Sequence, residues 1–555
     1  MPQNPFLQWY RLPPFDQFKP EDAAKAVDYV ETVVAEALNA VDNTPPTTFD
    51  ALMTILDPAE DILDRVGTVI SHLSSVGGPV WQKVTQSQMP RLTNLEHSLL
   101  VHRGSYLARR KLVDAENGSQ LTEAQRRLLT LKLDQAELSG VGLEGHKRER
   151  FAEMQERLSL LETTFGRNVT VEQGQRHVRI DDPDLVVGLA DSLKESAATL
   201  ARRVDAPNAT TEAGPWYFGV DWGTLIKVTS TSPNRRLREA VRREAARLGS
   251  GKDTDNRTVL VEILALRQAQ SELLGSESYA QLRAANRMSG SVAAIEEMLG
   301  KLEVASREPA VAQLEAVQQL AKSKGAPEAD SLAAWDTSYW REKLRNQETG
   351  FDSEGMRSYL PLDRVLAELF DLVNELYGVC IEWADGDASV WHPDVRFCRV
   401  TDAAKGHLLG HLYLDLHLRP GEKGDGAWVL QLVPRSTRLA ADQDTYRAPV
   451  VTLAINAPPK EEGKPSLLSP WEVASLFHEM GHATHALVSE VDERLISEIG
   501  SVDWEAIELP SQLLESWALS RPVLNRMARH HETGAPLPEE MINRLEEAQR
   551  FQKAG

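Results

Sequence analysis

The 555-residue sequence contains only two cysteines, Cys380 and Cys398. One possible disulfide would add little to a chain of this length, so we expect a reducing compartment. Basic residues are also in deficit, because 61 lysines and arginines stand against 82 acidic residues and the formal net charge is −21. Phosphate binding needs a basic face, so this deficit argues against nucleic acid as a partner. The charge is typical of a soluble cytoplasmic protein.

Long apolar segments are missing as well. The sequence has no run of about 20 apolar residues, so we expect no contact with a membrane through a spanning helix. The first residues, Met1-Pro2-Gln3-Asn4-Pro5, lack a basic region followed by an apolar one, and we expect no signal peptide. Internal repeats and low-complexity tracts are absent from the sequence. These absences favour a cytoplasmic globular protein, which we expect to be a monomer.

Apolar residues recur at helical spacing through most of the first 380 positions. The predicted helices include 19–42, 62–73, 120–138, 145–170, 233–248, 257–274, 291–324 and 361–377. Clusters of proline and glycine, such as Asn43-Thr44-Pro45-Pro46, end them. Residues 204–215 lack periodicity and are rich in turn-forming residues, so we place a domain boundary between an N-terminal helical domain, 1–203, and a second domain, 204–555.

The pattern changes to that of strands after Trp391. Apolar residues alternate strictly over 412–418 and again over 427–433, with a turn at 420–426 between them, which predicts a β-hairpin. A third strand fits 449–456. His411, Tyr413, Asp415 and His417 share one face of the first strand, but we favour a solvated face over a metal site, since unlike ligand types there lack a closing partner. The glycine-rich turn lacks the Lys-Ser/Thr ending of a phosphate loop.

Downstream of these strands stands the pentapeptide His478-Glu479-Met480-Gly481-His482, an H-E-x-x-H motif. Two histidines four residues apart on a helix point the same way. A divalent metal can therefore take one imidazole from each, while Glu479 lies beside them to handle a proton. The capping box in Ser469-Pro470-Trp471-Glu472 marks the start of the helix. Its apolar residues predict that the helix is buried; they are Trp471, Ala474, Leu476, Phe477 and Leu487.

A catalytic zinc ion usually takes three protein ligands. His485 lies about 10.5 Å along the helix axis from His478, too far to converge on the same ion. Position 488 is valine, which excludes the H-E-x-x-H-x-x-G-x-x-H type. The downstream carboxylates that remain are Glu490, Glu493, Glu498, Glu505, Glu508 and Glu515. We favour Glu508 because the proline at 510 restarts a helix there, and Glu505 is the second choice, as a ligand or as a group that holds a histidine N–H.

Residues 478–485 and the stretch Trp504-Glu505-Ala506-Ile507-Glu508-Leu509-Pro510-Ser511-Gln512 resemble the thimet oligopeptidase family of zinc peptidases, and within it the bacterial oligopeptidase A subgroup. The likeness covers nearly the whole chain, through 12–15, 263–267, 335–336, 391–397 and 413–416. It implies a mainly α, multi-helical, zincin-like fold with a small β-sheet beside the motif helix and a deep substrate channel. It also implies one zinc ion bound by His478, His482 and Glu508, with Glu479 as general base.

The function implied by this resemblance is a zinc-dependent metalloendopeptidase that hydrolyses internal bonds of short peptides, with residues 204–555 as the catalytic domain. One feature departs from the family. In relatives the helix corresponding to 539–555 continues into a further helical region whose tyrosines and histidines bind substrate, and we expect that part to be missing here. This leaves an alternative, a truncated and catalytically impaired homologue that binds zinc and peptides without turnover.

Overall fold

A computed structural model of the protein describes residues 3–8, 11–114, 121–419, 421–441, 444–459 and 463–553. Sequence features at Met1, Pro2, Pro420, Ala554 and Gly555 lie outside these residues. Within the described residues, no helix combines the length and the apolar character that crossing a membrane requires. The chain is mainly helical with a small mixed sheet, which confirms the predicted fold class.

The chain divides into two compact units, each formed by more than one segment of sequence. Unit 1 contains Met1–Leu143 and Asp352–Ile542, and unit 2 contains Glu144–Phe351 and Asn543–Gly555. Neither unit ends at the predicted boundary between 203 and 204. That turn-rich segment lies inside unit 2, because the helix before it and the strand after it pack into one hydrophobic core.

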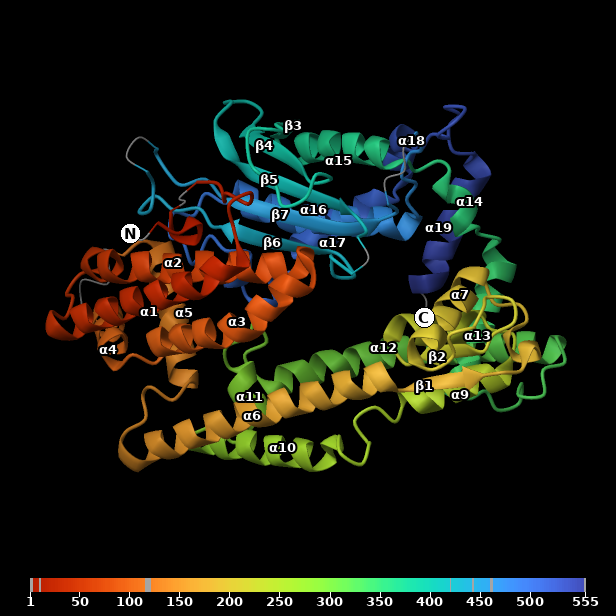
Figure 1. Ribbon diagram of the computed structural model, residues 1–555, viewed down its shortest axis with the longest axis horizontal. Helices are drawn as coiled ribbons and strands as arrows, with labels where there is room; N and C mark the ends of the chain where they lie inside the picture. Colours follow the sequence, from red (N-terminus) through yellow and green to blue (C-terminus); the bar gives the residue numbers. More distant parts are fainter. Residues whose placement is uncertain are drawn as a thin grey trace. The chain divides into compact units, whose positions relative to one another are not determined.

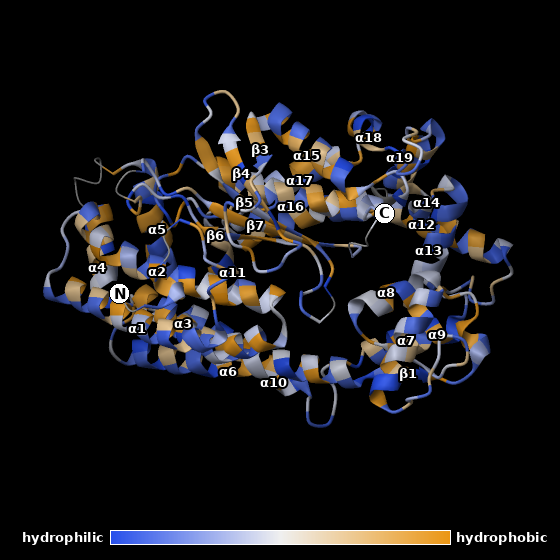
Figure 2. Ribbon diagram, turned by 45° about the horizontal axis from the view of Figure 1, so that its top comes forward, coloured by the Kyte–Doolittle hydropathy of each residue, from blue (hydrophilic) through white to orange (hydrophobic). Residues whose placement is uncertain are grey.

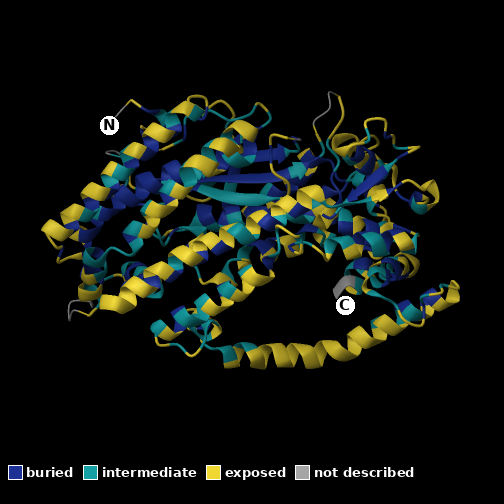
Figure 3. Ribbon diagram, turned by 60° about the horizontal axis from the view of Figure 1, so that its bottom comes forward, coloured by how far each residue is buried: buried dark blue, intermediate teal, exposed yellow. Residues whose placement is uncertain are grey.

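Unit 1 begins with five long helices whose apolar stripes form a shared core. They are α1 (Pro20–Asn43), α2 (Phe49–Val76), α3 (Gly78–Leu100), α4 (Arg103–Asp114) and α5 (Glu123–Leu138), after a short 3-10 helix, η1 (Pro5–Leu7). Local signals fix their starts, since Thr48 caps α2 and Thr122 forms a capping box for α5. Figure 3 shows helices with one buried and one exposed side, as amphipathic stripes predict.

The second segment of unit 1 contains a five-stranded sheet and the helices around it. Its elements are α14 (Ser353–Arg357), α15 (Leu362–Tyr377), β3 (Val379–Trp383), β4 (Arg396–Asp402), β5 (Leu408–His417), β6 (Trp428–Val433), β7 (Val450–Ala457), α16 (Pro470–Val488), η4 (Ile499–Ser501), η5 (Trp504–Ala506), α17 (Leu509–Ala518) and α18 (Arg521–Met527). Helix α19 (Glu539–Lys553) follows and contributes residues to both units.

The predicted hairpin of 412–418 with 427–433 is wrong. The strand order is β3-β4-β5-β7-β6, so β7 lies between the two strands that were expected to pair. Strand β7 pairs parallel with β5 and antiparallel with β6. The physical reason is burial: all but one of the side chains of β7 are buried, which suits a central strand, whereas the first four residues of β6 are only half-buried and suit an edge.

The face of β5 that was predicted to be solvated is in fact buried at its centre. Tyr413 and Asp415 are both buried. The Asp415 carboxylate accepts hydrogen bonds from Arg419 at 2.7 Å, from Lys423 at 2.9 Å and from Trp391 Nε1 at 2.8 Å. Burial acts to raise the pKa of Asp415, but these donors outweigh it and lower the pKa to about 2. A buried ion pair therefore fills the place where a solvated face was expected.

Helix α16 packs against β7, β6 and β5, and Figure 1 shows it alongside these strands. Figure 2 shows hydrophobic residues concentrated on the strands and on α16 and α17. The predicted start of α16 is confirmed, because the Ser469 hydroxyl accepts from the backbone of Glu472 and the Glu472 carboxylate accepts from the backbone of Ser469. Leu476 and Phe477 are buried as predicted, but Trp471 is 71% exposed because it lies on the helix face opposite to Val473 and Leu476.

Unit 2 consists of helices around a two-stranded antiparallel sheet. Its elements are α6 (Gly145–Gln175), β1 (His177–Ile180), η3 (Pro183–Val186), α7 (Asp191–Val204), β2 (Trp216–Gly219), α8 (Trp222–Thr231), α9 (Arg235–Ala245), α10 (Asn256–Leu273), α11 (Tyr279–Ala284), α12 (Val292–Ser323) and α13 (Ala334–Thr349). Trp216, Tyr217 and Phe218 of β2 fill the main core of this unit. Every residue of the metal-binding motif lies in unit 1.

Candidate metal centre

The metal centre depends on a close contact between α16 and α17. A Cβ atom placed on Gly481 would lie 2.5 Å from the carbonyl oxygen of Pro510 and 2.5 Å from Cα of Ser511. Real Cβ atoms do not approach other atoms so closely, so position 481 of the motif accepts only glycine. This contact places the start of α17, and with it Glu508, beside the motif on α16.

The side chains of His478, His482 and Glu508 converge. His478 Nε2 lies 3.1 Å and His482 Nε2 lies 3.3 Å from Glu508 Oε2, and one ligand atom from each residue lies within 4.8 Å of the others. The side chains are 25%, 12% and 51% exposed respectively, so the group is open to solvent. A small ion can therefore reach it without unfolding of the chain.

The spacing of these atoms fits a zinc ion. Ligand atoms about 2.0–2.1 Å from a tetrahedral zinc ion lie about 3.3 Å from each other. The two distances from Glu508 Oε2 to the imidazole nitrogens, 3.1 and 3.3 Å, match this ligand-to-ligand distance. Two imidazoles and one carboxylate are a donor set that zinc takes in catalytic sites.

Glu515 holds the ring of His478 from the other side. The Nδ1–H of His478 donates a hydrogen bond of 2.8 Å to Glu515 Oε2. Because a carboxylate can only accept, Nδ1 carries the proton and the lone pair of Nε2 is left for a metal. The sequence had suggested Glu505 for this role. Glu505 lies exposed in η5, and no hydrogen bond from it to a histidine is found among the described residues.

Glu508 is held in its charged form by its neighbours. Partial burial acts to raise the pKa of Glu508, but the hydrogen bond of 2.9 Å from the Ser511 hydroxyl and the two histidines outweigh it, so the pKa lies below its ordinary value. Burial lowers the pKa of His482, which favours the neutral imidazole that binds metals. Both residues are therefore in the protonation state that metal binding requires.

Glu479 differs from the other carboxylates of the site because it is buried. Burial raises its pKa to about 7, and the negative charge of Glu508 acts in the same direction, while His478 opposes both. A carboxylate with a pKa near neutrality is able both to take up and to release a proton. Its position between the two histidines on α16 places it next to the converging atoms.

The other sequence candidates have different partners. Glu493 accepts from Gln125, and Glu498 pairs with Arg494. His485 was excluded on distance, and its Nδ1 is buried without a hydrogen-bond partner among the described residues.

Sequence reasoning missed the positioning role of Glu515, although the spacing between Glu515 and Glu508 indicated that the two residues share a helix face. Seven residues separate it from Glu508, which places both on one face of α17.

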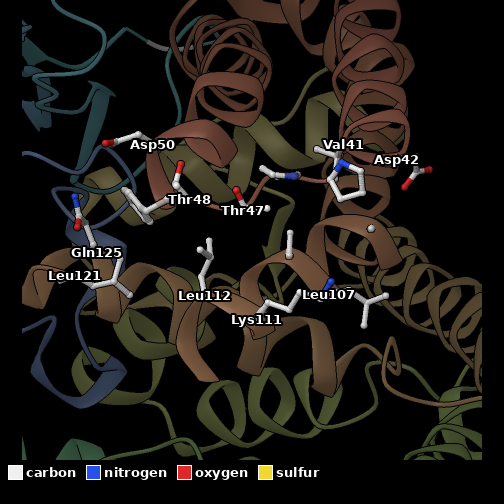
Figure 4. Close-up of a pocket in the computed structure, with 15 residues that line it drawn as sticks. Val41, Asp42, Thr47, Thr48, Asp50, Leu107, Lys111, Leu112, Leu121 and Gln125 are labelled. Carbon is white, nitrogen blue, oxygen red and sulfur yellow. The ribbon is translucent and has the colours of Figure 1, made fainter. Parts of the chain in front are cut away.

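A cavity of about 640 Å³ lies elsewhere in unit 1, between the α1–α2 turn, the start of α2, α4 and the start of α5. Figure 4 shows it with Thr47, Thr48, Leu112 and Gln125 on its walls. None of the predicted site residues is among the described residues that line it. Its walls are part apolar and carry no group of metal ligands among those residues.

Comparison with known families identifies the chain. Residues 228–555, more than half of the sequence, match Peptidase family M3. The chain belongs to this family. Residues 28–148 match the N-terminal domain of neurolysin and thimet oligopeptidase, so the likeness extends to the helices of unit 1 that precede the motif.

The relatives include oligopeptidases from plants and bacteria. The chain is 34% identical to the organellar oligopeptidase A and to the probable cytosolic oligopeptidase A of Arabidopsis thaliana, and 31% identical to oligopeptidase A of Escherichia coli. Each comparison covers 99% of this chain, and 69%, 78% and 80% of the respective relative.

Membership of this family confirms the predicted class, a zinc metalloendopeptidase that acts on peptides. The alternative of an impaired homologue that binds peptides without turnover is not favoured by the comparisons. The roles of individual residues rest on the geometry of the site.

Proposed function

We propose that this M3 peptidase binds one zinc ion through His478, His482 and Glu508 and hydrolyses internal bonds of short peptides, with Glu479 as general base. The convergence of three ligand atoms within 4.8 Å of one another, on two helices locked together at Gly481, is the observation that supports it. The fit of their spacing to a tetrahedral ion favours zinc among the divalent metals.

A zinc ion held there would polarise the carbonyl of the scissile bond and make a neighbouring water molecule more acidic. Glu479 takes the proton of the attacking water and delivers it to the leaving amine. Its raised pKa of about 7 suits both steps, since the group must be a base first and an acid afterwards. Glu515 keeps His478 in the tautomer that leaves Nε2 available.

The test separates metal binding from proton transfer. Glu479→Gln keeps the size of the side chain and removes the base, so we expect a loss of at least about 10²-fold in the cleavage of a quenched-fluorescence peptide with zinc content unchanged. Glu508→Ala is expected to lose zinc on dialysis. Unchanged zinc in Glu508→Ala would contradict the ligand assignment, and an active Glu479→Gln would contradict the role of the base.

We further propose that the protein acts as a monomer in the cytoplasm. The scarcity of cysteine and the likeness to a probable cytosolic oligopeptidase A support this location. The organellar relative shows that the family also works in other compartments. Fractionation of cells and the molar mass of the purified protein by light scattering test the two statements separately.

A further inference from the structure

The cavity of about 640 Å³ in unit 1 has the size and the walls of a small-molecule site. Such sites have volumes of about 300–1,000 Å³ and are lined mainly by apolar side chains with a few polar groups. Here Val41, Phe49 and Ala108 are buried and line the cavity. Leu112 and Leu121 are half-buried and extend the apolar wall. The cavity therefore accepts a molecule with an apolar body.

The polar side chains of the wall offer hydrogen-bond donors. The ammonium group of Lys111 and the hydroxyl of Thr47 have no hydrogen-bond or ion-pair partner among the described residues. The Thr48 hydroxyl accepts a bond of 3.2 Å from the backbone of Ala51, and its own O–H remains able to donate. Figure 4 shows Lys111 and Leu112 on one side of the cavity and the two threonines on the other. These donors call for an occupant that brings acceptors.

The acceptors of the same wall already have donors. Asp42 accepts a hydrogen bond of 3.2 Å from His102 Nε2, and Asp50 pairs with Arg438 at 3.0 Å. The amide of Gln125 is used on both sides, since its oxygen accepts from the backbone and its nitrogen donates to a glutamate. Both aspartates are well exposed, so water and salt screen their charges. A peptide, which carries N–H groups and an ammonium group, would leave donors unpaired here.

We propose that this cavity binds a medium-chain fatty acid, a molecule with an apolar chain and one carboxylate. The chain lies along the apolar wall, where each buried CH₂ group tightens binding about 4-fold. The carboxylate accepts from the Lys111 ammonium group and from the threonine hydroxyls, and the ionised molecule has no donor to be left unpaired. Binding needs neither zinc nor cleavage, so the inference is independent of the proposed function.

The experiment titrates octanoate, 1-octanol and leucyl-leucine separately into the zinc-loaded full chain, with isothermal titration calorimetry as the measurement. We expect octanoate to bind with a Kd of about 0.1–1 mM, as its small number of atoms allows. Leu112→Trp places a larger side chain in the cavity and should abolish the binding of octanoate and octanol. Zinc content and the melting temperature show that this variant is folded.

A second variant tests the charge without touching the core. Lys111→Met keeps the apolar stem of an exposed side chain and removes its ammonium group. Octanoate should bind about 5-fold more weakly to this variant, whereas the affinity of uncharged octanol should not change. The matched control is Lys83→Met, because Lys83 is an exposed lysine of α3 and is not among the described residues that line the cavity. It should bind octanoate with the wild-type affinity.

Each other result would overturn the inference. Octanoate that does not bind the wild type, or that binds a folded Leu112→Trp equally well, would show that the cavity is not its site. An equal effect of Lys111→Met and Lys83→Met on octanoate would show that Lys111 does not hold the carboxylate. Leucyl-leucine binding that matches octanoate in affinity and is lost in Leu112→Trp would make the cavity a peptide site. None of these outcomes bears on cleavage at the metal centre.

Discussion

The side chains around Arg494 and those around His478 are both groups of ionisable residues in unit 1, but they differ in the burial of the central residue and in the balance of charge. The Arg494 side chain is fully buried and pairs with Glu60 at 3.3 Å, with Glu498 at 3.3 Å and with Asp64. We call these four residues the Arg494 cluster. At the metal centre two histidines meet one carboxylate. None of these three described residues is a lysine or an arginine, and all three side chains are partly exposed.

This contrast separates structural charge from functional charge. A buried carboxylate without a partner is costly, so the Arg494 cluster provides the cation from the chain itself. Under the proposed function, the metal centre takes that cation from solution. Variants of the Arg494 cluster should therefore change the free energy of unfolding, and variants of the metal centre should change metal affinity.

The largest expected effect comes from Arg494→Met, which removes the buried cation and leaves three carboxylates around it. We expect unit 1 to lose about 3–5 kcal/mol of unfolding free energy, because breaking a buried pair leaves uncompensated charge. Urea unfolding measures the change. Arg399→Met is the control, since its ion pair with Asp387 is about half-exposed and should contribute less than about 1 kcal/mol. Equal effects of the two variants would show that burial is not what distinguishes the cluster.

Gly481→Ala tests whether helix contact assembles the metal centre. The added methyl group would meet the backbone of α17 at 2.5 Å, so the helices must separate, at a cost of about 1–3 kcal/mol. Zinc affinity should fall as well, because Glu508 moves with α17. Gly166→Ala in α6 is the control, as a Cβ there has no described atom within 4 Å, and it should stabilise the helix by about 0.5–1 kcal/mol. Unchanged zinc affinity in Gly481→Ala would contradict the prediction.

Glu515→Gln tests the hydrogen bond that orients His478. Removing the charge of this acceptor should weaken zinc binding about 10–100-fold, with little effect on the stability of the zinc-free protein. Competition with a chelator measures the affinity. Glu505→Gln, a neighbouring exposed carboxylate, should leave the affinity at the wild-type value. If the two variants behave alike, Glu515 does not hold His478.

The last expected effect depends on pH and concerns Asp57, a buried residue of α2 whose carboxylate lies 3.2 Å from Arg438. Burial raises the pKa of Asp57 to about 7, outweighing the nearby arginines. The folded chain then binds more protons than the unfolded chain between about pH 4 and 7, so this residue makes stability fall as pH rises through that window. Asp57→Asn should be more stable than the wild type at pH 8 and equal to it below pH 4. A constant difference across pH would exclude Asp57 as the titrating group.

The parts of the fold that were predicted correctly are set by local sequence. The capping box at Ser469 and the proline at 470 determine the start of α16 within the chain itself. Apolar periodicity likewise placed α1, α10, α12 and α15 within a few residues. The prediction that the two histidines of the H-E-x-x-H motif point the same way needed only the geometry of one helix.

The wrong predictions about the sheet concern contacts between distant segments. Alternation over 412–418 and 427–433 gave no sign that β7 lies between the two strands, because a short loop suggests direct pairing. The choice between Glu505 and Glu508 depended on how α17 meets α16, which the residue spacing alone left open. The two units follow from which segments pack together, and two separate stretches of sequence form unit 1.

The contact at Gly481 has a consequence for how the protein acquires its metal. Because α16 and α17 touch through their backbones, the ligand atoms are gathered before an ion arrives, and helix packing rather than the ion carries the entropic cost of gathering them. Under the proposed ligand assignment, zinc would enter and leave while the chain stays folded. The fraction of active molecules would follow the supply of free zinc around them, so the same chain can be switched on or off by metal availability without being made or degraded.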